Sequence, residues 1–209
     1  MSVGMALVDY IPVFLFLVTS VILQRDLYNK MSKGAFAVFC SGTIMVFAAG
    51  FFKATWKLLY AAGICDFYKL SEAFMPMQST GFFLAAAGLI AMMLAKQDSK
   101  KETMMAVAAV PVQYSGTMIF VAFMCSGIAA IGIVLSVVAA RMKKKGAVPL
   151  FILTIIGLLM MGYLSSKDFT NPLFNWMAEA VNVFAQGAFL WGTMILHKAG
   201  LADFRLKKA

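Results

Sequence analysis

The sequence contains few charged residues and a single histidine. Charged side chains make up 13% of its 209 residues, whereas soluble domains contain about a quarter. Because His197 is the one histidine, a haem or zinc site built from several histidines is excluded. Cys40, Cys65 and Cys125 form no CxxC pair and indicate neither a disulfide framework nor a metal site. We therefore expect no cofactor and no metal.

The familiar signatures of catalysis are also missing. The sequence has no GxSxG, HExxH, P-loop or GxGxxG motif. His197 stands at the end of an apolar segment, far from most other polar groups in it. We assign no catalytic residue. A lipid-modifying membrane enzyme that uses Glu179 or Asp66 as a general base is the remaining enzymatic alternative.

Long apolar segments dominate the sequence. Hydrophobic residues make up 62% of it, and several apolar runs reach the ~20 residues that cross a bilayer as a helix. This composition predicts an all-α integral membrane protein, a single polytopic domain over residues 1–209 that forms a compact bundle of six or seven transmembrane helices. The clear segments are 8–24, 35–60, 73–95, 115–140, 147–165 and 172–197.

The basic residues gather at the ends of these segments. The net charge of +9 comes mainly from "RDLYNKMSK", "KQDSKK", "RMKKK" and "RLKK", a pattern typical of cytoplasmic loops rather than of a nucleic-acid-binding surface. We expect these loops to contact anionic lipids of a cytoplasmic-type cell membrane, with the N terminus outside and the C terminus cytoplasmic. Residues 102–140 would then start and finish on one side. A short or re-entrant segment at 102–114 leaves six or seven crossings open.

Two pairs of similar stretches suggest an internal repeat. "KMSKGAFAVF" at 30–39 resembles "RMKKKGAVPLF" at 141–151, and "PMQSTG" at 76–81 resembles "PVQYSG" at 111–116. The first pair implies two three-helix units, which are parallel if a crossing separates them and inverted if none does. In a chain this rich in Ala, Met, Phe and Gly, chance similarity is the alternative explanation.

The last apolar segment carries a row of polar residues. At 100° per residue they fall within an arc of ~80° on one helix face. Because a carboxylate inside a span is unfavourable in lipid, we expect Glu179 to turn away from the lipid. The row either binds a partner helix through hydrogen bonds or lines a cavity that binds a ligand. Its members are Asn171, Asn175, Glu179, Asn182 and Gln186.

The second segment supplies cations for the opposite wall of such a cavity. In "FFKATWKLLY", Lys53 and Lys57 lie four residues apart on one helix face, next to Trp56. The lysines either extend to the membrane surface within an aromatic belt, or one turns inward to pair with Glu179 or to hold an anionic ligand group.

Other polar residues stand near the same level of the predicted bundle. Gln78 and Gln113 follow prolines at helix starts, where a side-chain amide can bind a polar ligand or cap the helix. Asp9, Tyr10 and Pro12 stand at the outer end of the first segment and could join the same vestibule.

Together these features favour a transporter, or the substrate-binding membrane subunit of one, for a small polar or zwitterionic solute. The alternative is a membrane sensor or assembly factor whose polar row binds a helix of a homo-oligomer or of a partner membrane subunit. The expected ligand-binding residues are Glu179, Asn175, Asn182, Gln186, Lys53, Lys57, Trp56, Gln78 and Gln113.

Overall fold

The apolar segments of the sequence form long helices. The computed structural model describes residues 2–94, 117–164 and 172–204, and every regular element within these ranges is helical. The long helices agree with the six expected segments to within three residues at each end. They are α2 (Tyr10–Leu27), α3 (Lys33–Ala61), α5 (Phe74–Leu94), α6 (Thr117–Arg141), α7 (Ala147–Leu164) and α8 (Pro172–Lys198), with the short elements α1 (Val3–Val8), η1 (Tyr28–Lys30) and α4 (Lys69–Glu72). The expected segment 102–114 lies outside the described residues.

Length and composition qualify four stretches of the described chain as candidate membrane spans. α7 is apolar but shorter, over Ala147–Met161. α8 is not among the four because Asn182 and Gln186 lower the hydropathy of its middle. The candidate spans are Val3–Lys30, Lys33–Ala61, Lys69–Leu94 and Met118–Arg141.

Proline marks where several helices begin. A proline has no N–H to donate and crowds the carbonyl four residues before it, so it is tolerated in the first turn of a helix and not in the middle. Pro12, Pro76 and Pro149 are each the third residue of their helices α2, α5 and α7, and Pro172 is the first residue of α8. The positions where these four helices begin therefore agree with the local positions of proline in the sequence.

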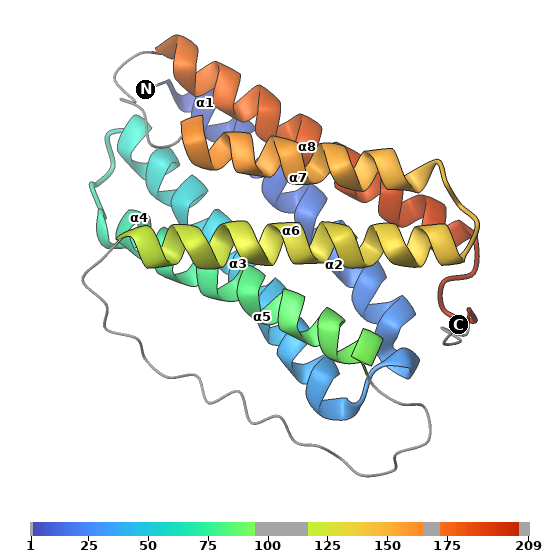
Figure 1. Ribbon diagram of the computed structural model, residues 1–209. Helices are drawn as coiled ribbons and strands as arrows, with labels where there is room; N and C mark the ends of the chain where they lie inside the picture. The colour runs from blue at the N-terminus through green and yellow to red at the C-terminus, as the bar shows by residue number, and fades with distance from the viewer. Residues whose placement is uncertain (1, 95–116, 165–171, 205–209) are drawn as a thin grey trace.

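The six long helices pack in a closed ring (Figure 1). Going round the ring, α2 contacts α3, α3 contacts α5, α5 contacts α6, α6 contacts α7, α7 contacts α8, and α8 contacts α2. α3 and α7 run in the opposite direction to the other four. Consequently α5 and α6 are parallel neighbours, and α5 ends at the end of the bundle opposite to the one where α6 begins.

Small residues bring α3 and α5 close together. A methyl group on Gly42 would come 2.6 Å from the carbonyl oxygen of Gly81, and one on Gly88 would come 2.7 Å from Cβ of Phe39. There is no room for a side chain at either position. Small residues at a helix contact let two backbones approach, which is the usual basis of helix packing in lipid.

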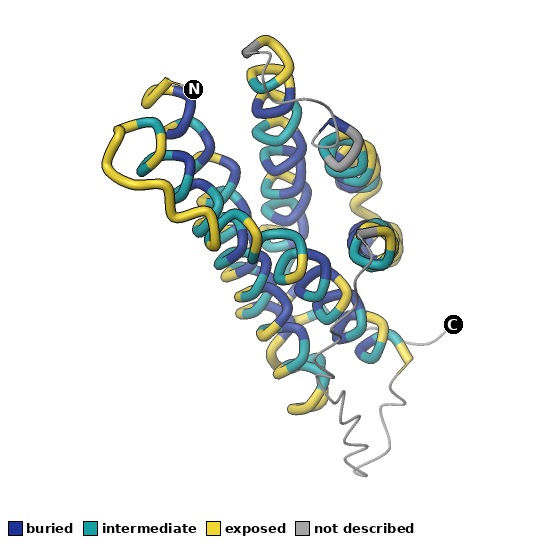
Figure 2. The backbone as a smooth tube through the Cα atoms, turned by 90° about the vertical axis from the view of Figure 1, so that its left-hand side faces the viewer, coloured by how far each residue is buried: buried dark blue, intermediate teal, exposed yellow. Residues whose placement is uncertain are grey.

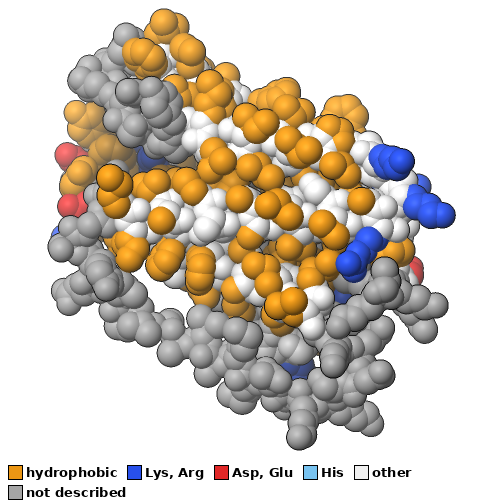
Figure 3. Space-filling view, viewed as in Figure 1, with side chains coloured by type: hydrophobic (Ala, Val, Ile, Leu, Met, Phe, Trp, Pro, Cys, Tyr) orange, Lys and Arg blue, Asp and Glu red, His pale blue; other side chains and the backbone are white. Residues whose placement is uncertain are grey.

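The outer surface of the ring is apolar. Hydrophobic side chains cover much of the face of the bundle seen in Figure 3, and large exposed apolar residues of the ring include Trp191 (67% exposed) and Ile44. Buried positions lie on the inward faces of the helices (Figure 2), where Phe39 and Phe151 are part of one core. An apolar surface of this extent is typical of contact with lipid or another protein rather than with water.

Charge distinguishes the two ends of the bundle. Lysines and arginines stand where α2, α6 and α8 end and where α3 begins, and Figure 3 shows basic side chains at the right-hand end of the visible face. We call this the basic end, and it carries Arg25, Lys33, Arg141, Lys144 and Lys198. The opposite end, where α3 ends and α8 begins, is called the cavity end.

Candidate functional site

A cavity of about 100 Å³ lies inside the ring near the cavity end. Typical small-molecule pockets measure ~300–1,000 Å³, so this one suits a few water molecules or a solute of a few heavy atoms. All six long helices contribute to its wall. Its apolar lining includes Phe16, Val46, Phe82, Met124, Ile128 and Leu158, and its polar lining consists of Asp9, Lys53, Lys57, Gln78, Glu179, Asn182 and Gln186.

Asp9 occupies a break between α1 and α2. Pro12 has no N–H for the carbonyl of Val8 and its ring crowds that carbonyl, so a continuous helix is interrupted there. The N–H of Asp9 still donates to the carbonyl of Met5 at 3.2 Å. The carboxylate of Asp9 reaches the cavity wall from this break.

Lys57 joins two carboxylates, one from the break before α2 and one from α8. Its Nζ contacts Oδ2 of Asp9 and lies 3.5 Å from Oε1 of Glu179. Asp9, Glu179 and Lys57 are only 6%, 7% and 9% exposed. Attraction offsets the desolvation of such a buried cluster only in part, and removal of one partner from a buried ion pair typically costs ~3–5 kcal/mol.

Lys53 adds a second cation to the same wall. It stands about one turn before Lys57 on α3 and lines the cavity. Its Nζ lies 3.9 Å from the ring centroid of Phe74, a cation–π contact. The formal charges of Asp9, Glu179, Lys53 and Lys57 therefore sum to zero.

Three buried oxygens of the cavity wall accept no hydrogen bond from the residues that the structure describes. They are Oδ1 of Asp9, Oε2 of Glu179 and Oε1 of Gln186. An unsatisfied buried acceptor costs ~1–3 kcal/mol, and more if it is charged. Because Gln186 follows Glu179 by seven residues, it lies ~10 Å further along α8. The cavity thus offers acceptors for N–H or O–H donors at two depths.

The pattern of α8 explains how one helix supplies these groups. Glu179 and Gln186 are buried and line the cavity, while Phe184 and Trp191 lie on the exposed face of the same helix. The polar face is inward and the apolar face is outward, which is the reverse of an amphipathic helix on a water-soluble protein.

The structure brings together most of the residues that the sequence suggested. Asn175 and Trp56 are not part of the cavity wall. Trp56 instead donates from Nε1 to Oδ1 of Asp66 at 2.9 Å and stacks on Tyr60. Gln113 lies outside the described residues. The expected residues that do line the cavity are Glu179, Asn182, Gln186, Lys53, Lys57 and Gln78.

The role of Asp9 was not evident from the sequence. Sequence reasoning put Asp9 at the edge of a vestibule and did not identify it as a partner of Lys57. The available signal was a charged residue within an apolar stretch, three positions before Pro12. The pairing itself depends on tertiary contacts between α2, α3 and α8.

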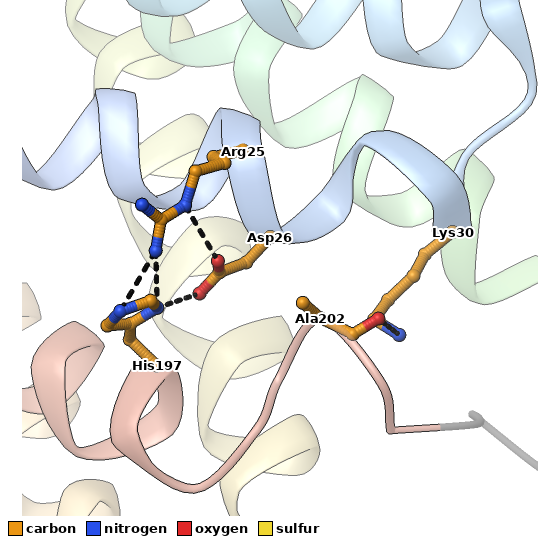
Figure 4. A network of polar contacts seen from close by, with 5 residues as sticks. All are labelled: Arg25, Asp26, Lys30, His197 and Ala202. Atoms are coloured by element: carbon orange, nitrogen blue, oxygen red, sulfur yellow. Dashed lines mark hydrogen bonds and ion pairs between the residues drawn. The ribbon is translucent and has the colours of Figure 1, made fainter.

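A second buried carboxylate network lies at the basic end (Figure 4). Oδ2 of Asp26 lies 2.8 Å from Nδ1 of His197, and Nη2 of Arg25 lies 3.0 Å from Nε2 of His197. Lys30 Nζ donates to the carbonyl oxygen of Ala202 at 3.0 Å, which ties the chain after α8 to the end of η1. The network could not be predicted from the sequence, where its one signal is an aspartate inside a basic run.

Among the described residues, no group of three or more His, Cys, Asp or Glu side chains could hold a metal ion. The chain matches no protein-family model, no curated protein and no solved structure. The candidate site is therefore interpreted from its own chemistry.

Proposed function

We propose that the protein is a multi-pass membrane protein that binds a small polar or zwitterionic solute in the cavity and carries it across the bilayer, as a transporter or as the substrate-binding subunit of one. The observation that carries this proposal is the buried Asp9–Lys57–Glu179 cluster in the wall of a small cavity. Ionisable groups inside an apolar bundle are unfavourable and usually mark a substrate or ion path. The small volume argues against a lipid as the substrate.

The proposed topology has seven crossings. If each long helix spans the bilayer, the parallel directions of α5 and α6 require one further crossing between them. The positive-inside tendency favours a cytoplasmic basic end and an outward-facing cavity end, in a cytoplasmic-type cell membrane.

We further propose that the bundle is built from two parallel three-helix units, α2–α3–α5 and α6–α7–α8. In each unit the middle helix runs opposite to the other two. The similar stretches 30–39 and 141–151 stand at the starts of these two middle helices, α3 and α7. Parallel repeats of this kind are known in transporters.

Uptake into proteoliposomes tests the function. The purified protein is reconstituted and offered a panel of radiolabelled zwitterions and polyols of two to four carbons. We expect uptake of at least one zwitterion above that of protein-free liposomes. Glu179→Gln and Lys53→Ala should each lower its initial rate at least tenfold, because each removes a charge from the cavity wall.

Trp56→Phe serves as the matched control, because Trp56 is close in sequence to both lysines but is not part of the cavity wall. Its uptake rate should stay within about twofold of the wild type. Uptake that is unchanged in Glu179→Gln and Lys53→Ala would contradict the site. A stoichiometric partner protein that is lost in Asn182→Leu, with no uptake of any probe, would favour the assembly-factor alternative.

A further inference from the structure

Lys57 contacts only one oxygen of each of its two carboxylate partners, Asp9 and Glu179. Its ammonium contacts Oδ2 of Asp9 and Oε1 of Glu179, while the second oxygen of each carboxylate is buried and accepts no hydrogen bond within the described part of the chain. Both residues line the cavity. The pair therefore has spare acceptors for a group with several N–H donors, and a primary ammonium has three.

We propose that Asp9 and Glu179 recognise the primary ammonium group of a small zwitterionic solute, and that Lys57 occupies the ammonium position as a tethered substitute until the solute binds. This inference rests on the proposed function and names the class of solute that the cavity accepts.

The geometry allows such an exchange. Asp9 comes from the break before α2, Lys57 from α3 and Glu179 from α8, and the Lys57 ammonium lies between the two carboxylates. A lysine ammonium sits on a flexible four-carbon stem. It can leave the carboxylates by side-chain rotation, without movement of a helix.

The charges of the wall favour a zwitterion over a simple cation. Asp9, Glu179, Lys53 and Lys57 carry two negative and two positive formal charges, so a net-neutral solute leaves no uncompensated buried charge. When the solute ammonium replaces that of Lys57, the released Lys57 ammonium can pair with the anionic end of the solute, on a wall that also includes Lys53.

The volume and the apolar part of the wall set the size of the solute. About 100 Å³ accommodates a chain of a few carbons between the two charged groups. Phe16, Phe82 and Ile128 would contact that chain. A fully methylated ammonium has the same charge but no N–H donor, and would leave the oxygens of Asp9 and Glu179 unsatisfied.

Binding of β-alanine and of its N-trimethyl derivative tests the recognition of the ammonium group. The full-length protein is purified in detergent, and both dissociation constants are measured by calorimetry. We expect β-alanine to bind at least tenfold more tightly than the trimethyl derivative. Glu179→Gln and Asp9→Asn should each weaken β-alanine binding at least tenfold, while Trp56→Phe leaves it unchanged. Equal affinity for the two probes would overturn the proposal.

Lys57→Met tests whether the Lys57 ammonium competes with the solute for Asp9 and Glu179. Without its ammonium the carboxylate pair has no internal competitor, so the variant should bind methylammonium at least tenfold more tightly than the wild type does. Methylammonium should also raise the melting temperature of this variant more than that of the wild type. An affinity for methylammonium no higher than that of the wild type would show that Lys57 does not compete for the site.

Lys57→Arg decides the same question if Lys57→Met does not fold. A guanidinium binds carboxylates with two parallel hydrogen bonds and should hold the position more firmly than an ammonium does. We therefore expect β-alanine affinity to fall several-fold in a variant that keeps the charge. An unchanged or higher affinity would overturn the role of Lys57.

Binding and uptake together separate the two proposals. If β-alanine binds with the expected selectivity but no zwitterion is taken up, the transport function fails and recognition of the ammonium group stands. If another solute is taken up and β-alanine does not bind, recognition of the ammonium group fails and transport stands.

Discussion

At the residue scale, Asp26 is the most deeply buried carboxylate of the described chain, at 2% exposure. One oxygen interacts with His197 Nδ1 at 2.8 Å, and the other lies 3.6 Å from Arg25 Nε. The contacts fit a neutral histidine whose Nδ1–H donates to Asp26 and whose Nε2 accepts from Arg25. The network joins α2 to α8 at the basic end (Figure 4).

Replacement of His197 should therefore destabilise the bundle at this end. His197→Ala leaves the buried carboxylate without its hydrogen-bond donor, which costs ~1–3 kcal/mol. We expect the melting temperature in detergent, followed by tryptophan fluorescence, to fall by several degrees. Lys198→Ala is the matched control, since Lys198 is the next residue and is exposed. Equal melting temperatures for the two variants would show that the network contributes nothing to stability.

The inward orientation of Glu179 could be predicted from helical spacing, but the residues that contact it could not. The spacing puts Glu179, Asn182 and Gln186 on one face of a helix, and a carboxylate on the lipid side would be unfavourable. The identity of the residue opposite depends on the order of helices around the ring, which one sequence does not contain. For this reason the convergence of Asp9 and Lys57 on Glu179 required the structure.

At the element scale, the helix ends were more predictable than the directions of the helices. The apolar runs predicted the bounds of the long helices to within three residues, because an apolar run is a local signal. The prolines in the first turns are a local signal of the same kind, which the prediction did not use. The parallel packing of α5 and α6 follows from contacts between distant residues, such as the stacked rings of Phe83 and Phe123. Charge patterns alone left the number of crossings undecided.

The close contact between α3 and α5 predicts that a methyl group added at Gly42 destabilises the bundle. In Gly42→Ala the added methyl would lie within 2.6 Å of the Gly81 carbonyl oxygen and 2.9 Å of Cα of Ala85. Backbone atoms cannot rotate away, so the helices must separate. We expect a loss of ~1–3 kcal/mol in the free energy of unfolding, measured by denaturation in detergent.

Gly187→Ala provides the control for the same substitution in an open helical position. Apart from the adjacent backbone of α8 itself, no atom of the described residues lies within 4 Å of a methyl group at Gly187, and alanine favours the helix over glycine by ~0.5–1 kcal/mol. This variant should match or exceed the wild type in stability. Equal losses in both variants would show that the small-residue contact does not hold α3 against α5.

At the scale of the whole molecule, charged side chains are buried and large apolar side chains are exposed, which is the reverse of their distribution in a water-soluble protein. The charged Asp9–Lys57–Glu179 cluster is buried, and Trp191 and other large apolar side chains are exposed around the ring (Figure 3). A bilayer would stabilise this arrangement, because lipid would cover the exposed apolar surface and the backbone hydrogen bonds are satisfied within helices. In the proposed topology the two ends of the bundle face different aqueous compartments.

Thiol labelling tests this orientation with a cysteine that the chain already has. Cys65 is exposed at the cavity end, in the hairpin between α3 and α5, so a membrane-impermeant maleimide should label the wild type in intact cells. Cys65→Ser should abolish the labelling, since Cys40 and Cys125 lie within α3 and α6 and are partly buried. Lys144→Cys, added to Cys65→Ser, introduces an exposed thiol at the basic end. That thiol should react only after the membrane is permeabilised.

The converse labelling pattern would reverse the topology and direct the cavity to the cytoplasm. Labelling of both positions in intact cells would contradict a membrane-spanning bundle.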